Sequence, residues 1–280
     1  MGQRILSTLL LWVIVIAVLH FGGTTGGVWL IALLAGATQL EFYRMLKRTG
    51  LEPFNRLGLT VGAVLVLAPY YLENYHVRTT YLLAGAVIVF ALRILSEREP
   101  HNRMETLAAT LFGVLYVPFM LQFLVRILAL FTGLALGVWL VAVAKFCDVG
   151  ALLTGLAFGR HQMAPNISPK KTWEGAAGGI VVSAGVGALL VWLGNSGRFG
   201  GPFFPENFTP LRAALMAVPV AMASVVSDLV ESIIKRRAEV KDTSQLIPGI
   251  GGVFDLTDSL ILAAPIGYFL FCFCLSAGGS

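Results

Sequence analysis

Long apolar segments recur along the chain and constrain its fold more than any other feature. A helix needs about 20 apolar residues to cross the hydrocarbon core of a bilayer. Segments that approach or reach that length lie at residues 5–21, 27–43, 57–72, 80–95, 106–125, 134–158, 176–194, 211–233 and 256–276. Only 12% of the residues are charged and 57% are hydrophobic, so the chain lacks the charged surface of a soluble domain. The sequence therefore predicts an all-α polytopic integral membrane protein with about nine transmembrane helices.

The first two apolar segments are separated by a glycine-rich run. Arg4 before the first segment is compatible with a signal peptide, but similar segments follow and no clear small-residue cleavage site ends it. We therefore expect the first segment to be a retained helix. The run contains four glycines around two threonines, which predicts a tight turn between the first two helices, at Gly22, Gly23, Gly26 and Gly27.

The basic residues predict the orientation of the chain in the membrane. The loops after the even-numbered segments, at residues 44–56, 93–103, 160–171 and 235–241, hold 14 of the 20 Lys and Arg residues. Cytoplasmic loops carry such an excess, so we expect these loops in the cytoplasm, both termini outside, and the protein in the cell inner (plasma) membrane. Topology and attraction to anionic lipid explain the net charge of +5, so no nucleic-acid partner is expected.

Carboxylates in or at the ends of the later segments are candidates for a functional site. An ionisable side chain at the bilayer centre costs about 2.5–3.5 kcal/mol, so each one needs a partner, a cavity or a metal. The candidates all lie toward the predicted cytoplasmic face and are Asp148, Asp228, Glu231, Asp255 and Asp258. We expect one membrane domain over residues 1–280, with N-terminal helices in 1–133 and catalytic helices and cytoplasmic loops in 134–280.

The spacing of these carboxylates suggests how they meet. Asp228 and Glu231 are three residues apart, as are Asp255 and Asp258, so each pair projects from one side of its helix, and the two pairs can converge. Crowded carboxylates need a positive charge between them, and such hard oxygen ligands suit Mg²⁺. Alternatively, they pair with nearby basic residues and only anchor the helix ends. The spacing leaves both interpretations open.

Two predicted cytoplasmic loops carry further candidate residues. Residues 168–175 place Lys170 and Lys171 just before an apolar segment, where lysines and a helix N-terminus together favour a phosphate. The same residues could instead form a basic anchor with a helix cap. Residues 248–252 form a glycine turn, which brings backbone close to a ligand or simply reverses the chain. Together with the carboxylates, these loops would suit Mg²⁺-assisted transfer of a phosphorylated group between a nucleotide and a lipid.

Four motifs from residue 148 to residue 258 resemble those of one enzyme family in their order along the chain. Residues 148–151 resemble its D-T-G-A motif, residues 168–175 its S-P-x-K-T-x-E-G loop, and residues 227–232 its G-D-x-x-E-S segment. The family signature is matched at Ser232, Lys235, Arg236, Lys241, Asp242, Ser244, Pro248, Gly251, Gly252, Asp255 and Asp258. On these residues the chain resembles the phosphatidate cytidylyltransferase family, also called CDP-diacylglycerol synthase.

The resemblance implies a nucleotidyltransferase of phospholipid biosynthesis that moves the cytidylyl group of CTP to phosphatidate, forming CDP-diacylglycerol and pyrophosphate. It implies catalytic roles for Asp228, Asp255, Lys235, Lys241 and Asp242, and substrate binding by Ser168, Lys171, Thr172, Arg236, Gly251 and Gly252. The implied metal ligands are Asp228 and Asp255, completed by Asp148, Glu231 and Asp258. The implied cofactor is Mg²⁺, with K⁺ left open as a second cation. A homodimer with its site open to the cytoplasm and to lipid is also implied.

Two positions depart from the family pattern. Ile250 stands where the family has His, and Leu256 stands where it has Arg. Neither alkyl group can hydrogen-bond a phosphate or orient a carboxylate. A divergent paralogue acting on another lipid phosphate or an isoprenoid is therefore the alternative within enzymes. A membrane transporter is the alternative outside them, although no internal repeat supports it.

Overall fold

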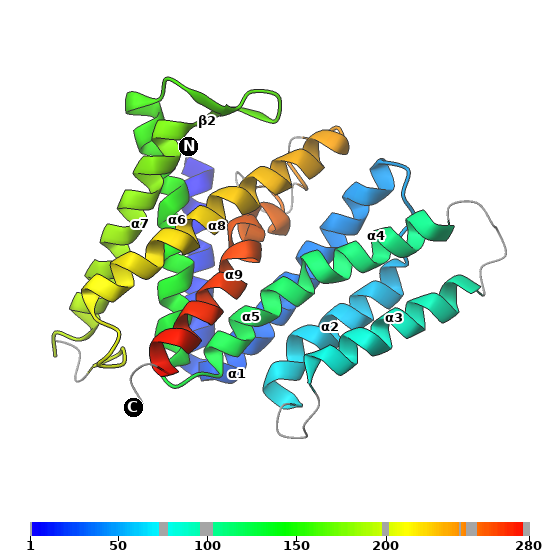
Figure 1. Ribbon diagram of the computed structural model, residues 1–280, viewed down its shortest axis with the longest axis horizontal. Coiled ribbons are helices and arrows are strands. Elements are labelled where there is room, and N and C mark those ends of the chain that lie inside the picture. Colours follow the sequence, from blue (N-terminus) through cyan, green and yellow to red (C-terminus); the bar gives the residue numbers. More distant parts are fainter. Residues whose placement is uncertain are drawn as a thin grey trace. The chain divides into compact units, whose positions relative to one another are not determined.

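The computed structural model describes residues 2–72, 78–95, 103–197, 202–240, 242–244 and 251–276. These residues form nine α-helices and a short β-hairpin (Figure 1): α1 (Gly2–Arg48), α2 (Asn55–Tyr71), α3 (Thr79–Leu95), α4 (Arg103–Tyr116), α5 (Pro118–Leu128), α6 (Gly133–Phe158), β1 (Gln162–Ala164), β2 (Ser168–Thr172), α7 (Trp173–Gly194), α8 (Pro210–Arg237) and α9 (Val253–Ser276). The predicted apolar segments all coincide with helices, the first two with α1 and the fifth with α4 and α5 together.

The prediction of an all-α membrane protein is confirmed. Among the described residues, six segments are long and apolar enough to cross a membrane: Leu10–Arg48, Arg103–Leu128, Gly133–Phe158, Trp173–Gly194, Pro210–Arg237 and Val253–Leu275. Helix α3 is a shorter apolar helix. These segments are fewer than the predicted crossings, in part because the first of them contains two helices that meet at Gly23.

Backbone contacts divide the chain into two compact units. Unit 1 comprises Met1–Ala129 and Ile234–Thr257, and unit 2 comprises Leu130–Ile233 and Asp258–Ser280. Helix α8 therefore ends in unit 1, and helix α9 begins there. The single domain and the boundary near residue 133 that we expect from the sequence stay predictions.

Helix α1 changes direction at Gly23, whose φ of 54° and ψ of −143° are not helical. In Figure 1 the two halves of α1 run in different directions from this point. They pack closely beside it, because a Cβ on Gly26 would come within 2.7 Å of the Val18 carbonyl oxygen. This combination of φ and ψ is accessible essentially to glycine alone. The chain thus turns within the predicted glycine run without an intervening loop.

Replacing Gly23 by Ala is expected to destabilise the protein by about 1–3 kcal/mol, because a Cβ strains this backbone conformation. No heavy atom lies within 4 Å of the position that this Cβ would take, so the cost is conformational and not a clash. Gly22→Ala is the matched control, since Gly22 has equal space and lacks a positive φ. Thermal unfolding in detergent measures the difference, and equal melting temperatures for the two variants would contradict it.

Buried side chains from α1, α2 and α4 join the helices of unit 1. The buried Tyr43 hydroxyl donates to the carbonyl of Thr110 at 3.0 Å, and Gln39 Nε2 donates to the carbonyl of Gly58 at 2.9 Å. Gly58 and Gly113 both face the Tyr43 ring, so their lack of a side chain lets the helices approach. A neighbouring apolar core contains Leu65, Ala86, Phe90 and Val114.

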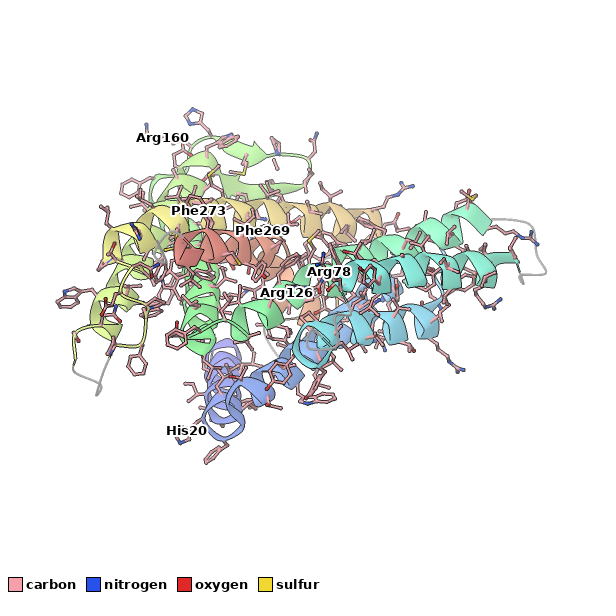
Figure 2. The ribbon with its side chains drawn as sticks, turned by 60° about the horizontal axis from the view of Figure 1, so that its bottom comes forward. His20, Arg78, Arg126, Arg160, Phe269 and Phe273 are labelled. Carbon is pink, nitrogen blue, oxygen red and sulfur yellow. The ribbon has the colours of Figure 1, made fainter. Side chains whose placement is uncertain are left out.

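Close packing of α6 against α7 organises unit 2. A Cβ on Gly150 of α6 would come within 2.7 Å of the Val182 side chain of α7. Small residues permit this approach, which is how helices gain contact energy in lipid. Phe269 and Phe273 of α9, labelled in Figure 2, are 60% and 76% exposed, as expected of side chains that face lipid.

Candidate functional site

Three acidic side chains of unit 2 meet between helices α8 and α9. Asp228 and Glu231 come from α8, and Asp258 comes from α9. One carboxylate oxygen from each lies within 4.8 Å of the other two, and we call these three residues the carboxylate cluster. Glu231 is 1% exposed, whereas the Asp228 side chain is 30% exposed. Of the two pairs expected to converge, Asp228 and Glu231 are thus joined in unit 2 by Asp258 of the second pair.

Two lysines bring positive charge to the acidic residues of unit 2. Lys171 of β2 places its Nζ 2.5 Å from an Asp228 oxygen. Lys145 of α6 places its Nζ 3.5 Å from Asp258 and 3.6 Å from Asp148, one turn away on its own helix. The sequence interpretation missed Lys145, although its spacing of three residues from Asp148 would have identified the pair.

The carboxylate cluster fits a divalent cation. Two oxygens on opposite sides of one Mg²⁺ lie about 4.2 Å apart, twice the Mg–O distance of about 2.1 Å, so a bound ion would draw these oxygens, which lie within 4.8 Å of one another, slightly closer together. Carboxylate oxygen is also the ligand type that Mg²⁺ prefers, and a cation between carboxylates relieves their repulsion. The partial exposure of Asp228 leaves one side of the cluster accessible.

Main-chain contacts hold Asp258 in the cluster. The Ser227 hydroxyl, one residue before Asp228, donates to the Asp258 carbonyl and so ties α8 to α9. The backbone N–H of Ser259 donates to Asp258 Oδ1 at 2.6 Å, and the Ser259 hydroxyl accepts from Lys145 Nζ at 2.7 Å. These bonds fix the side chain that the cluster shares with Lys145.

The β-hairpin positions Lys171. Strands β1 and β2 are antiparallel, with Gln162 opposite Thr172 and Ala164 opposite Ser168. Thr172 is the N-cap of α7, and its hydroxyl accepts from the Gly175 N–H at 3.1 Å. Lys171 precedes this cap directly, so the start of α7 sets its place. The substrate contacts predicted for Ser168 and Thr172 stay predictions.

Glu174 connects the start of α7 to the residues that precede the hairpin. Its Oε2 accepts the backbone N–H groups of Arg160 and His161 at 3.1 and 3.2 Å. Its Oε1 lies 2.5 Å from the His161 Nδ1. The end of α6 is thereby bound to the first turn of α7.

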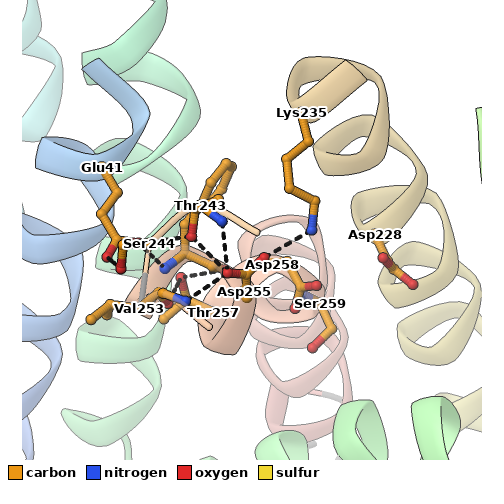
Figure 3. Close-up of polar contacts among 12 residues, drawn as sticks. Glu41, Asp228, Lys235, Thr243, Ser244, Val253, Asp255, Thr257, Asp258 and Ser259 are labelled. Atoms are coloured by element: carbon orange, nitrogen blue, oxygen red, sulfur yellow. Dashed lines mark hydrogen bonds and ion pairs between the residues drawn. The ribbon is translucent and has the colours of Figure 1, made fainter. Parts of the chain in front are cut away.

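Asp255 has a different environment, within unit 1 (Figure 3). Its Oδ1 accepts from Lys235 Nζ at 2.8 Å. Its Oδ2 accepts from the Thr243 hydroxyl at 2.7 Å, the Thr243 N–H at 3.1 Å and the Gly252 N–H at 2.7 Å. Protein donors thus engage both oxygens, so the structure brings the predicted residues Lys235 and Asp255 together. The metal-ligand role that the resemblance gives Asp255 stays a prediction.

Glu41 of α1 is a second buried carboxylate in unit 1 and is 2% exposed. It accepts from the Ser244 hydroxyl at 2.7 Å and the Phe254 N–H at 2.8 Å, and it shares the single proton of the Thr243 hydroxyl, 3.1 Å away, with Asp255 (Figure 3). The sequence interpretation did not select it, although an acid near the end of an apolar segment is the signal used for the other candidates.

The two glycines before α9 pack against protein carboxylates. A Cβ on Gly251, whose φ is +121°, would come within 2.6 Å of Asp255 Oδ2. A Cβ on Gly252 would overlap the Thr243 hydroxyl and a Glu41 oxygen. The close approach predicted for these glycines is therefore made to the chain itself, and their contact with substrate stays a prediction.

The remaining predicted residues lie in the stretch from the end of α8 to the first turn of α9, and some of them are outside the described residues. Asp242 and Arg236 are exposed and belong to unit 1. Leu256 lies in the first turn of α9. Lys241 and Ile250 lie outside the described residues.

Replacing Glu41 by Gln is expected to lower the stability of the protein by about 2 kcal/mol, because a buried carboxylate that accepts three hydrogen bonds is exchanged for an amide with one acceptor oxygen. The melting temperature in detergent reports the loss. Glu52→Gln is the control, since Glu52 is exposed. A melting temperature equal to that of the control would show that the three donors do not depend on the charge.

The chain matches the model of a family described as the cytidylyltransferase family over residues 2–274. Three of its relatives are named phosphatidate cytidylyltransferase. The protein of Haemophilus influenzae is 39% identical over 140 residues, which cover 50% of this chain and 46% of that protein, so the aligned part is about half the length of this relative. The Synechocystis protein is 28% identical over a 305-residue alignment that covers 95% of each chain. The Rickettsia bellii protein is 32% identical over 192 residues, 66% of this chain and 78% of that protein.

Proposed function

Because this chain belongs to the cytidylyltransferase family, we propose that it transfers the cytidylyl group of CTP to phosphatidate, forming CDP-diacylglycerol and pyrophosphate. The observation that carries the proposal is the carboxylate cluster of unit 2 with Lys171 against it. Carboxylates that hold a cation, beside an ammonium group that holds a phosphate, are the groups that phosphoryl-group transfer requires.

The reaction exchanges one bond to phosphorus for another. An oxygen of the phosphatidate phosphate attacks the α-phosphorus of CTP, a new P–O bond forms, and the bond from the α-phosphorus to the bridging oxygen breaks to release pyrophosphate. When bound, Mg²⁺ neutralises phosphate oxygens and lowers the cost of the charge that develops during transfer. Asp228, Glu231 and Asp258 would hold this ion.

The chain's own residues orient the phosphates. Lys171 lies on a hairpin that is fixed to α7. Its ammonium group forms an ion pair with Asp228 and can replace this pair by one with a phosphate oxygen. Lys235 and Asp255, for which the resemblance implies catalytic roles, lie in unit 1. There the Asp255 carboxylate accepts a hydrogen bond from the Lys235 ammonium group and fixes its position. Preorganised charges of this kind act without reorganising during the reaction, which makes them effective in catalysis.

The topology we propose has nine crossings, with α1 crossing twice about its bend at Gly23. Residues 10–48 would measure about 58 Å as a straight helix, nearly twice the core of a bilayer. The distribution of Lys and Arg favours a cytoplasmic position for the carboxylate cluster, where CTP is available. Location in the cell inner membrane is part of the same proposal. A homodimer is part of the same proposal and follows from the family resemblance.

Transfer of label from CTP to lipid tests the proposed reaction. Purified protein in detergent is incubated with Mg²⁺, phosphatidate and CTP labelled at either the α- or the γ-phosphate. We expect α-label in the lipid phase and γ-label in pyrophosphate, since cytidylyl transfer retains only the α-phosphorus. Lipid that carries γ-label would instead indicate a CTP-dependent kinase and would overturn the proposal. Replacing phosphatidate by an isoprenoid alcohol or its phosphate identifies the acceptor.

A further inference from the structure

Lys145 is a cation inside an apolar helix, placed between acids from two different helices. Residues Ala142, Val143, Ala144 and Cys147 around it on α6 are buried. The Lys145 side chain is 26% exposed, so it does not extend freely from the helix. A lysine retained in a membrane helix is costly, and it persists where partners offset that cost.

The partners of Lys145 fix where its charge lies. Its Nζ donates to the Ser259 hydroxyl at 2.7 Å and lies 3.5 Å from Asp258 and 3.6 Å from Asp148. An ammonium group has three N–H donors, and three oxygen-bearing side chains surround this one. The charge is therefore held between Asp148 of α6 and Asp258 of α9.

Asp258 belongs to the carboxylate cluster and also faces the Lys145 ammonium group. On one side its carboxylate belongs to the cluster with Asp228 and Glu231, and on the other it faces Lys145. A second metal ion bridging Asp258 and Asp148 would have to occupy the position of the ammonium group. Two cations cannot share that position, because like charges at such distances repel strongly in a low-dielectric site.

We propose that Lys145 is a built-in cation that takes the place of a second metal ion, so that the site binds one divalent ion at Asp228, Glu231 and Asp258. The inference rests on the metal site of the proposed function and adds its stoichiometry. Lys145 acts on that ion through Asp258, which makes it a positioning residue.

Counting bound Mn²⁺ tests the inference independently of activity. Mn²⁺ replaces Mg²⁺ as a paramagnetic probe, and the free ion is measured by electron paramagnetic resonance during titration of the purified protein. We expect one bound ion per chain in the wild type and in Lys145→Arg, which keeps the charge. We expect two in Lys145→Met, which keeps the length of the side chain and removes the charge.

Equal counts in the wild type and Lys145→Met, whether one or two, would overturn the role of Lys145 while leaving the metal site of the proposed function intact. No bound ion in the wild type would overturn the metal site itself. Lys145→Gln is a second variant in case the Met variant does not fold, and the melting temperature identifies folded protein. Two bound ions in the wild type would overturn the inference without any variant.

Discussion

Replacing Asp228 by Asn is expected to lower cytidylyl transfer about a thousandfold, the scale seen when a preorganised electrostatic group is removed from an active site. Asp228 is the more exposed member of the cluster and pairs with Lys171, so the change removes a proposed metal ligand and the partner of a proposed phosphate-binding lysine. The protein should remain folded, because losing one of three crowded carboxylates relieves repulsion.

Thermal unfolding separates this loss from misfolding. Without metal, Asp228→Asn should melt at or above the temperature of the wild type. Added Mg²⁺ should raise the melting temperature of the wild type, since an ion that binds the native state stabilises it, and should have little effect on the variant. Glu52→Gln is the matched control, because it neutralises an exposed acid of unit 1 that is not a member of the cluster. Near-normal turnover by Asp228→Asn would contradict metal ligation by this residue.

Replacing Asp255 by Asn is expected to lower turnover about a hundredfold. The main cause is that the groups bound to Asp255 lose their positions, and weaker binding of a metal ion contributes less. The Asp255 carboxylate accepts from Lys235, Thr243 and Gly252. An amide keeps one acceptor oxygen and turns an NH₂ group toward donors, so the segment before α9 and the Lys235 ammonium should both shift. The melting temperature should fall for the same reason.

The Mg²⁺ dependence of the residual activity distinguishes the two roles of Asp255. If Asp255 positions Lys235 and the preceding segment, the Mg²⁺ concentration for half-maximal activity should equal that of the wild type. A severalfold higher requirement would support the direct ligation that the family resemblance implies. Glu239→Gln is a suitable control, since Glu239 is an exposed acid in the same part of unit 1.

Hydropathy alone was sufficient to predict where the helices lie. An apolar segment in lipid must satisfy its backbone hydrogen bonds internally, so segment and helix coincide. Hydropathy could not predict that the two halves of α1 meet directly at Gly23, because a glycine run is equally compatible with a longer loop. It also could not predict the strand at residues 168–172, whose pairing with residues 162–164 depends on backbone contacts.

The candidate site was predictable where its residues share a helix. The spacing of Asp228 and Glu231 placed both on one side of α8, and Asp258 joins them as expected. Contacts between distant segments were not predictable in this way. Glu41 meets Thr243 and Ser244 across about 200 residues, and only tertiary packing brings such residues together. For the same reason, spacing could not show that Asp255 engages Lys235.

The most direct test of the account is the position of a bound Mn²⁺ ion, located by its anomalous scattering in crystals of the purified protein. We predict one strong peak about 2.1 Å from carboxylate oxygens of Asp228, Glu231 and Asp258, the distance typical of a hard divalent ion and its oxygen ligands. Crystals soaked in Mn²⁺ that show no peak at these three residues, or a peak elsewhere in the chain, would contradict the account.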